Sequence, residues 1–167
     1  MLATVRLAEG GRLRRGQWQH GLPGARSTRD TARAVSQRNV EILRRAYDAF
    51  SRGDFDAIVN LSAEDFELDM SRWGPVTYTY RGPEGLREFL ATLERLWDYF
   101  KIEPEEFVDA GDKVVVIIDV EARGGASGIK VRARYANAYT FRGDGKVVRA
   151  EWFDQPAEAL AVVGLPV

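Results

Sequence analysis

The sequence has no cysteine and only one histidine, His20, and these two shortages exclude several kinds of catalytic site. Without cysteine there can be no disulfide, no thiolate nucleophile and no cysteine-ligated metal. His20 lies outside the expected domain, so a histidine triad, a zinc site or a histidine proton shuttle in the core is also excluded. We expect no metal site, and any acid–base chemistry must come from Asp, Glu, Tyr, Lys or Arg.

Long apolar runs are missing too, since none approaches the roughly 20 residues that span a bilayer. Hydrophobic residues make up 45% of the chain and charged residues 29%, an ordinary balance for a soluble protein. We therefore expect one cytoplasmic domain with no membrane partner. Lysine is scarce, with four against twenty arginines, which hints at a GC-rich bacterial genome.

Charge is unevenly distributed along the chain. Residues 1–35 hold seven arginines against two acids, a net of +5, so the remaining residues carry about −6 of the total of −1. An acidic domain without a basic stripe argues against a nucleic-acid partner.

Residues 1–35 are predicted to be a disordered basic extension, because they are rich in Gly and Arg and show no sustained hydrophobic period. An export signal would need an apolar core of about 7–15 residues after the arginines, and none follows. An Arg-rich organellar presequence remains an alternative, although Gly21–Gly24 interrupts it. An upstream start that is not used in the cell is another. The folded domain is expected to span residues 36–167.

The domain is predicted to begin with two helices, Gln37–Arg52 and Phe55–Leu61. The first has one apolar stripe at helical spacing, ended by Gly53. Its members are Val40, Leu43, Tyr47 and Phe50. Asp54 can cap the second helix.

A short strand at Phe66–Met70 and an extended run at Val76–Tyr80 are predicted next. Gly82-Pro83-Glu84 then opens a third helix, with Pro at the first helical position. Its apolar stripe continues to Phe100. About 18 helical residues span roughly 27 Å, enough to lie across a sheet.

The remaining elements are predicted to be four antiparallel strands and a closing helix, at Ile102–Val108, Lys113–Arg123, Lys130–Phe141, Lys146–Phe153 and Pro156–Val163. The glycine-rich segment Gly124–Gly128 joins two strands, so it indicates a hairpin turn and not a phosphate-binding loop. No other cofactor motif is present, and we expect no cofactor.

The last hairpin has an aromatic-rich dry face that carries two polar residues, Asn137 and Asp154. If Phe141 pairs with Lys146, then Asn137 faces Ala150, Tyr135 faces Trp152 and Ala133 faces Asp154. Asn137 and Asp154 would then lie roughly 13–14 Å apart along the sheet, at ~3.3 Å per residue. At that separation the two side chains cannot act on the same atom.

Three segments in order resemble the SnoaL-like branch of the nuclear-transport-factor-2-like superfamily. They are Arg45-Ala-Tyr-Asp-Ala-Phe-Ser-Arg-Gly-Asp-Phe-Asp-Ala-Ile-Val, Tyr80-Arg-Gly-Pro-Glu-Gly-Leu-Arg-Glu-Phe and Tyr139-Thr-Phe-Arg-Gly-Asp-Gly-Lys-Val-Val. The resemblance covers about Gln37–Leu165. It implies an α+β fold, a cone-shaped barrel in which a strongly bent antiparallel sheet wraps around helices and leaves an apolar pocket.

Proteins of this kind include polyketide cyclases, ketosteroid isomerase, dehydratases, epoxide hydrolases and many proteins of no known activity, so the fold does not settle the function. Their sheets often pair through the outer face, so the resemblance also implies a homodimer. The ketosteroid isomerase pattern fits poorly. Its general base falls on Met70, with Asp69 one residue off. Its oxyanion-binding acid falls on Asn137, and its tyrosine on or beside Ala46, with Tyr47 next.

SnoaL-type cyclases and epoxide hydrolases use acidic groups from the later strands, where Asp154 is the carboxylate of this chain. Asp154 is therefore the leading candidate for a pocket acid or base, with Asn137 orienting a carbonyl. Desolvation of a fully buried Asp154 would raise its pKa by up to ~3–5 units. Alternatively, Asp154 caps the closing helix. Asp119 and Asp69 are weaker candidates, and the simplest interpretation is that both face outward.

The aromatic residues of the dry faces are predicted to bind a small hydrophobic or aromatic molecule. These candidate ligand-binding residues are Tyr135, Tyr139, Trp152, Trp73, Tyr78 and Phe89. Two functions remain open: a cofactor-independent isomerase, cyclase or lyase, or a non-catalytic ligand-binding or dimerisation module. A pocket that buries Asp154 would favour the enzyme, and a solvent-exposed Asp154 would remove its main support.

Overall fold

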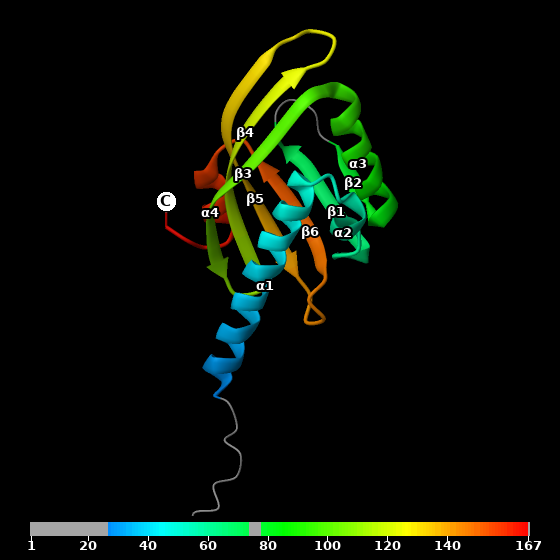
Figure 1. The fold of residues 1–167 in the computed structure, drawn as a ribbon. Helices are drawn as coiled ribbons and strands as arrows, with labels where there is room; N and C mark the ends of the chain where they lie inside the picture. Colours follow the sequence, from blue (N-terminus) through cyan, green and yellow to red (C-terminus); the bar gives the residue numbers. More distant parts are fainter. Residues whose placement is uncertain (1–26, 74–77, 167) are drawn as a thin grey trace, which may run out of the picture.

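Six strands form one curved sheet in the computed structural model, which describes residues 27–73 and 78–166 (Figure 1). The strands lie in the order β2-β1-β6-β5-β4-β3. Their bounds are Ser62–Arg72 (β1), Thr79–Arg81 (β2), Trp97–Ala110 (β3), Lys113–Gly124 (β4), Lys130–Phe141 (β5) and Val147–Phe153 (β6). Among these strands β1 and β6 pair in parallel, and the other neighbours are antiparallel. The predicted α+β cone with a bent sheet is confirmed.

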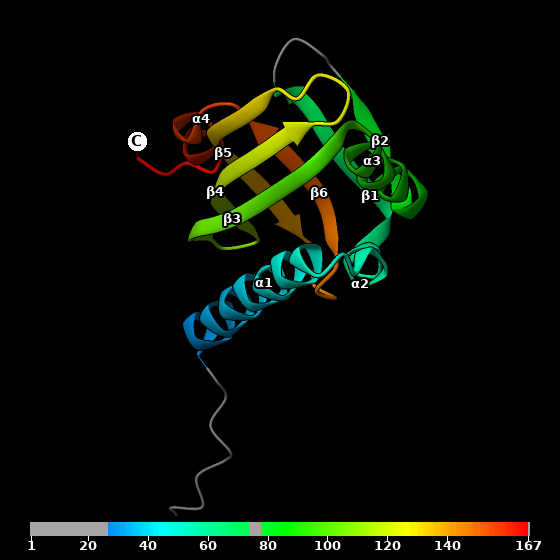
Figure 2. The ribbon, with the colours of Figure 1, turned by 45° about the horizontal axis from the view of Figure 1, so that its top comes forward.

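The described residues also form four helices, whose positions beside the sheet can be followed in Figure 2. They are α1 (Thr28–Ser51), α2 (Phe55–Val59), α3 (Gly82–Leu96) and α4 (Pro156–Val162). Helices α1 and α3 pack their apolar faces against the inner face of the sheet, while α4 packs against the outer face. In the described part of the chain, no helix is both long and apolar enough to cross a membrane.

Helix α1 begins earlier than the hydrophobic pattern predicts. Ser27 caps it, because its side chain accepts a hydrogen bond of 3.2 Å from the backbone N–H of Arg29. Residues 28–35, predicted as part of a disordered extension, are therefore helical. Their side chains are exposed, so no apolar stripe marks them in the sequence. The rest of the predicted extension, residues 1–26, lies outside the described residues.

Helix α3 ends before its apolar stripe does. Its buried residues are Leu86, Phe89, Leu90 and Leu93. Trp97 then adopts an extended backbone and begins β3, five residues ahead of the predicted start at Ile102. Phe100, which the sequence places on the helix, instead packs from β3 against Phe50, with ring centroids 6.1 Å apart. The apolar pattern continues past the end of α3 because α3 and β3 bury their apolar residues in the same core.

The two faces of β4 are now assigned. Val114, Val116, Ile118 and Val120 belong to the main core. Asp119 and Glu121 point to the outer face, where each forms an ion pair of 3.0 Å, with Arg134 and Arg132 respectively. The simplest interpretation of Asp119, that it faces outward, is thus the one observed.

The register of the last hairpin differs from the predicted one by two residues. Asn137 pairs with Trp152 and Tyr139 with Ala150. The turn is one residue longer than predicted, since Phe141 pairs with Val147, and a bulge follows that leaves Val148 as an extra residue. The predicted pairings of Asn137 with Ala150 and of Tyr135 with Trp152 are therefore wrong. Asp154 follows two residues after Trp152, the partner of Asn137.

A second, smaller core lies beneath α4. It consists of Val115, Ala136, Ala138, Phe153 and Ala159. Because α4 covers the outer face here, the middle of β5 is buried on both faces, and residues 136–138 lose the alternation seen earlier in the strand. The main core lies on the inner face and is the part of the fold that positions the candidate site.

Candidate functional site

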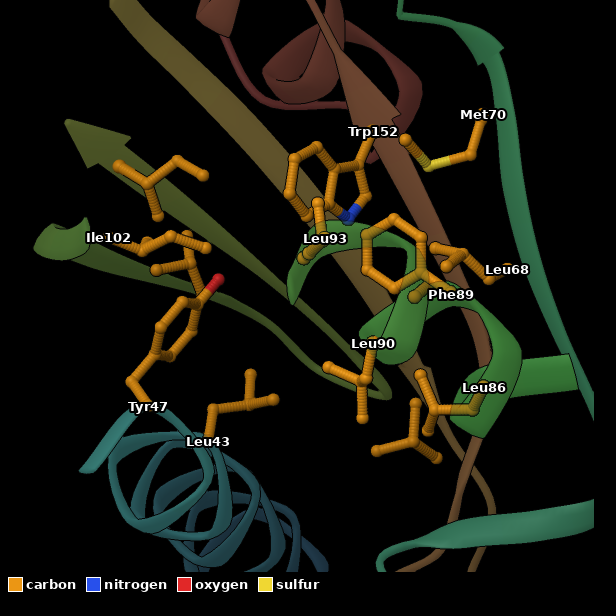
Figure 3. Packing of buried hydrophobic residues seen from close by; sticks show 14 of the residues in the cluster. Leu43, Tyr47, Leu68, Met70, Leu86, Phe89, Leu90, Leu93, Ile102 and Trp152 are labelled. Atoms are coloured by element: carbon orange, nitrogen blue, oxygen red, sulfur yellow. The ribbon is translucent and has the colours of Figure 1, made fainter. Parts of the chain in front are cut away.

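A cavity of about 100 Å³ lies inside the main core, between α1, α2, α3 and the sheet. Its wall is largely apolar. Figure 3 shows several of these side chains pointing toward one another from α1, α3 and β6. The apolar lining residues are Leu43, Ala46, Phe50, Ile58, Leu61, Phe66, Leu68, Leu86, Phe89, Leu90, Ile102, Val147, Ala150 and Trp152. The polar ones are Tyr47, Ser62, Asn137 and Tyr139.

The Ser62 hydroxyl cannot donate a hydrogen bond to a ligand, because its proton is already used. It donates a hydrogen bond of 2.6 Å to the backbone carbonyl of Val59 and is buried. Apart from the indole N–H of Trp152, the polar chemistry of the cavity therefore rests on Tyr47, Asn137 and Tyr139.

These three side chains form a hydrogen-bonded triangle, which we call the Tyr–Asn–Tyr cluster. Helix α1 supplies Tyr47, and β5 supplies Asn137 and Tyr139, which share a face because they are two residues apart. The two hydroxyl oxygens lie 2.9 Å apart. The amide nitrogen of Asn137, Nδ2, donates to the hydroxyl of Tyr47 at 3.0 Å and to that of Tyr139 at 3.2 Å.

Counting protons fixes the orientation of the Asn137 amide. Three contacts among three polar atoms need three protons, and two hydroxyls supply only two. If the carbonyl oxygen faced the tyrosines, one contact would lack a proton, so the amide nitrogen must face them. The carbonyl oxygen, Oδ1, is then turned away. It is fully buried and accepts no hydrogen bond from any described residue.

Both tyrosines are neutral donors at physiological pH. Burial raises the pKa of Tyr47 well above its ordinary value of 10.0, and the proximity of Tyr139 adds to the rise. Burial also raises the pKa of Tyr139. Of the described residues that line the cavity, none carries a carboxylate. The cavity can therefore donate a hydrogen bond to a ligand. Its described lining residues include no carboxylate, histidine or lysine that could act as a general acid or base.

Several predicted ligand-binding residues meet at this cavity. Phe89, Tyr139 and Trp152 line it, together with Asn137. Trp73 and Tyr135 are not among the lining residues. Trp73 packs edge-on against Trp152, with ring centroids 5.5 Å apart, and against Tyr135 at 6.0 Å.

Tyr78 lies apart from the cavity lining. Its side chain is 48% exposed, and its ring packs against that of Tyr80 with centroids 4.5 Å apart. The predicted ligand-binding roles of Tyr78 and Trp73 therefore gain no support from the lining.

Asp154 lies at the exposed end of β6 and is not among the lining residues. Its backbone N–H donates to the carbonyl of Arg72 at 3.1 Å. Gln155, not Asp154, is the N-cap residue of α4. Burial raises the pKa of Tyr135, and the charge of Asp154 adds to that rise. An exposed Asp154 removes the main support for a catalytic acid–base role.

Asp69 is also outside the cavity lining. Its carboxylate accepts from the backbone N–H of Ser71 at 2.9 Å and pairs with Arg149 at 2.6 Å. Partial burial raises the pKa of Asp69, but these hydrogen bonds and the charges of Arg149 and Arg72 outweigh it and lower the pKa overall. The carboxylate is held ionised on the outer face.

Tyr47 is the site residue that the sequence did not single out. It was placed on the apolar stripe of the first helix and beside the expected tyrosine of ketosteroid isomerase. One signal was present: a buried Asn137 requires hydrogen-bond partners, and a tyrosine on a packed helical stripe can provide one.

Comparisons with known proteins agree with this fold. Residues 43–150 match the family model described as a SnoaL-like domain. An NTF2-like protein from Burkholderia xenovorans LB400 is 28% identical, with a TM-score of 0.61 over 77% of this chain and 96% of that one. TerC, co-crystallised with polyporic acid, is 25% identical, with a TM-score of 0.62 over 75% and 98%.

A protein with a ketosteroid isomerase-like fold from Catenulispora acidiphila DSM 44928, in complex with trimethylamine, is 18% identical. Its TM-score is 0.61 over 75% of this chain and 94% of that one, a likeness of fold alone. A search of curated proteins finds no match to the chain.

Proposed function

The chain belongs to the SnoaL-like domain family, and from this premise we propose that it binds a small, largely apolar molecule inside the core cavity. The observation that carries the proposal is an apolar cavity with one polar feature, the Tyr–Asn–Tyr cluster. Apolar walls favour a hydrophobic body, while the cluster fixes the position of one polar group.

The size of the cavity limits the ligand. An engineered cavity of about 150 Å³ holds one benzene molecule, so the cavity of about 100 Å³ fits a single small ring or a short branched chain. The aromatic walls provided by Phe89 and Trp152 suit such a ring. A larger ligand would require the walls to move apart.

Binding without chemistry is better supported than catalysis. A cofactor-independent isomerase, cyclase or lyase would need a base within reach of the bound molecule. The described lining residues include no carboxylate, and Asp154 is exposed. The tyrosine hydroxyls could polarise a ligand carbonyl but cannot remove a proton from carbon at neutral pH, because their pKa values are raised. The co-crystal of TerC with polyporic acid supports small-molecule binding by this fold.

The experiment is native purification followed by mass spectrometry of any small molecule that accompanies the protein. We expect a small neutral or weakly polar molecule with the wild type. Ala46 lines the cavity, so Ala46→Leu should fill it and remove the molecule. The control is Ala34→Leu, an exposed position on the same helix. A molecule retained equally by both variants would show that it binds elsewhere.

We also propose a homodimer that forms through the outer face of β3–β5. This face carries acids and arginines in pairs, including Glu121 with Arg132 and Asp119 with Arg134. A two-fold axis would bring acids of one copy near arginines of the other. Sedimentation at low and high salt tests the proposal: a dimer held this way should weaken as salt rises, and a monomer at both would contradict it.

A further inference from the structure

The Tyr–Asn–Tyr cluster has hydrogen-bonding capacity left after its own three contacts. The Asn137 amide nitrogen donates to both tyrosine hydroxyls. The amide oxygen, Oδ1, is a buried acceptor that receives no hydrogen bond from the described residues. A buried carbonyl in this condition is disfavoured unless something donates to it.

The two tyrosines keep one hydrogen-bond donor, which complements this acceptor. One hydroxyl donates to the other across 2.9 Å, and the accepting hydroxyl keeps its own proton. That proton is a donor, because the raised pKa values keep both hydroxyls neutral. The cluster therefore offers one acceptor and one donor.

The acceptor and the donor lie close together. Oδ1 and Nδ2 belong to one planar amide, and Nδ2 is 3.0 and 3.2 Å from the two hydroxyl oxygens. A single small polar group can contact both once the wall around the fully buried Oδ1 opens to admit it. All three cluster residues line the cavity, whose other walls are apolar.

Building on the proposed function, we infer that the cavity selects molecules whose polar end carries a hydrogen-bond acceptor and a donor on neighbouring atoms. Lactams, cis amides and hydroxy ketones have this arrangement. The acceptor atom receives the spare tyrosine proton, while the neighbouring N–H or O–H donates to Asn137 Oδ1. The group must be neutral, since none of the described lining residues has an ionised side chain to balance a charge.

The experiment uses three five-membered rings of similar size that differ at one group. In 2-pyrrolidinone a C=O lies next to an N–H, cyclopentanone has the C=O alone, and methylenecyclopentane has neither. Binding to the full chain is measured by NMR titration for the wild type and for Asn137→Leu. We expect Asn137→Leu to weaken 2-pyrrolidinone about tenfold or more relative to methylenecyclopentane, and to affect cyclopentanone much less.

Ser62→Ala is the matched control. Ser62 also lines the cavity, but its hydroxyl is occupied by the carbonyl of Val59. Its removal should change the affinities for the three rings alike. If Asn137→Leu proves unfolded by its near-UV circular dichroism, the wild type provides the second measurement. N-methyl-2-pyrrolidinone lacks the donor, and it should bind about tenfold more weakly than 2-pyrrolidinone.

The outcomes separate the inference from the proposed function. Equal weakening of the lactam and the ketone by Asn137→Leu, or tight binding of the N-methyl lactam, would overturn the donor–acceptor inference while binding by the cavity stands. If none of the three rings binds the wild type, the proposed function fails, and the inference that rests on it fails too.

Discussion

Two asparagines are fully buried in the core, and they differ in what surrounds them. Asn137 lines the cavity and donates to two tyrosines. Asn39, on α1, is 1% exposed, does not line the cavity, and neither of its side-chain polar atoms has a hydrogen-bond partner among the described residues. A buried amide without partners costs stability, so the two residues should respond differently to the same substitution.

We predict that Asn39→Leu stabilises the protein, because it replaces an unsatisfied amide by an apolar side chain of similar size. The gain should be about 1–3 kcal/mol in the free energy of unfolding, measured by urea denaturation. Gln37→Leu, an exposed change on the same helix, should stay within about 0.5 kcal/mol of the wild type. A destabilised Asn39→Leu would mean that the amide is satisfied in solution.

Because Tyr47 and Tyr139 are buried, we predict that the protein loses stability at basic pH. Burial raises the pKa of Tyr47 in the folded state above its unfolded value of 10.0. Its contribution is therefore fully present below about pH 10 and is lost as the pH rises from there toward the folded-state pKa. In that window Tyr47 alone should lower the free energy of unfolding by about 1.4 kcal/mol per pH unit.

Denaturant titrations at several basic pH values check this, with Tyr47→Phe as the comparison. The variant should show a shallower decline above pH 10, because it lacks one titrating group. Identical slopes for wild type and Tyr47→Phe would show that Tyr47 titrates as in the unfolded chain.

At the scale of helices and strands, the sequence predicts well wherever one pattern suffices. Strand β5 and the start of α4 have the predicted bounds, because period-2 alternation and a proline mark them. The start of α1 was missed, since its exposed first turns contain no apolar stripe. The β5–β6 register was missed because turn length and a bulge decide it, and neither appears in the alternation of the strands.

Helix α4 packs on the outer face of the sheet through one fully buried small residue, with partly buried Leu160 and Val163 beside it. Ala159 is fully buried against the second core, while Ala157 on the same helix is exposed. We predict that Ala159→Leu costs about 1–3 kcal/mol, because the added atoms must force α4 away from Phe153 and its neighbours. Ala157→Leu should be nearly neutral. Thermal unfolding of both variants checks the difference, and equal melting temperatures would contradict close packing of α4.

For the molecule as a whole, the candidate site could be predicted only in part. Strand parity correctly placed Asn137, Tyr139 and Trp152 on the inner face. It also placed Asp154 there, but parity does not tell how far along a strand the cavity extends. The cavity is bounded by α1, α2 and α3, and these contacts between distant segments have no local signature in the sequence.

The way into the cavity also depends on contacts between distant segments. The short helix α2 and the residues after it provide Ile58 and Leu61 to the wall. On the outside, α2 is held to α3 by an ion pair of 2.5 Å between Asp56 and Arg87. Gly53, at a φ of 70°, precedes α2 and can absorb a rotation. We take the five-residue α2 as the candidate entrance segment of the cavity.

We predict that Arg87→Gln speeds both the association and the dissociation of methylenecyclopentane, because the ion pair to Asp56 must break before α2 moves aside. An exposed ion pair contributes about 0.2–1 kcal/mol, so each rate should rise up to about fivefold. The dissociation constant should barely change, since the occupied and empty cavities share the same wall. NMR exchange line shapes measure both rates. Arg45→Gln, which breaks the exposed pair with Glu41 on α1, should leave them unchanged; faster exchange in both variants would place the entrance elsewhere.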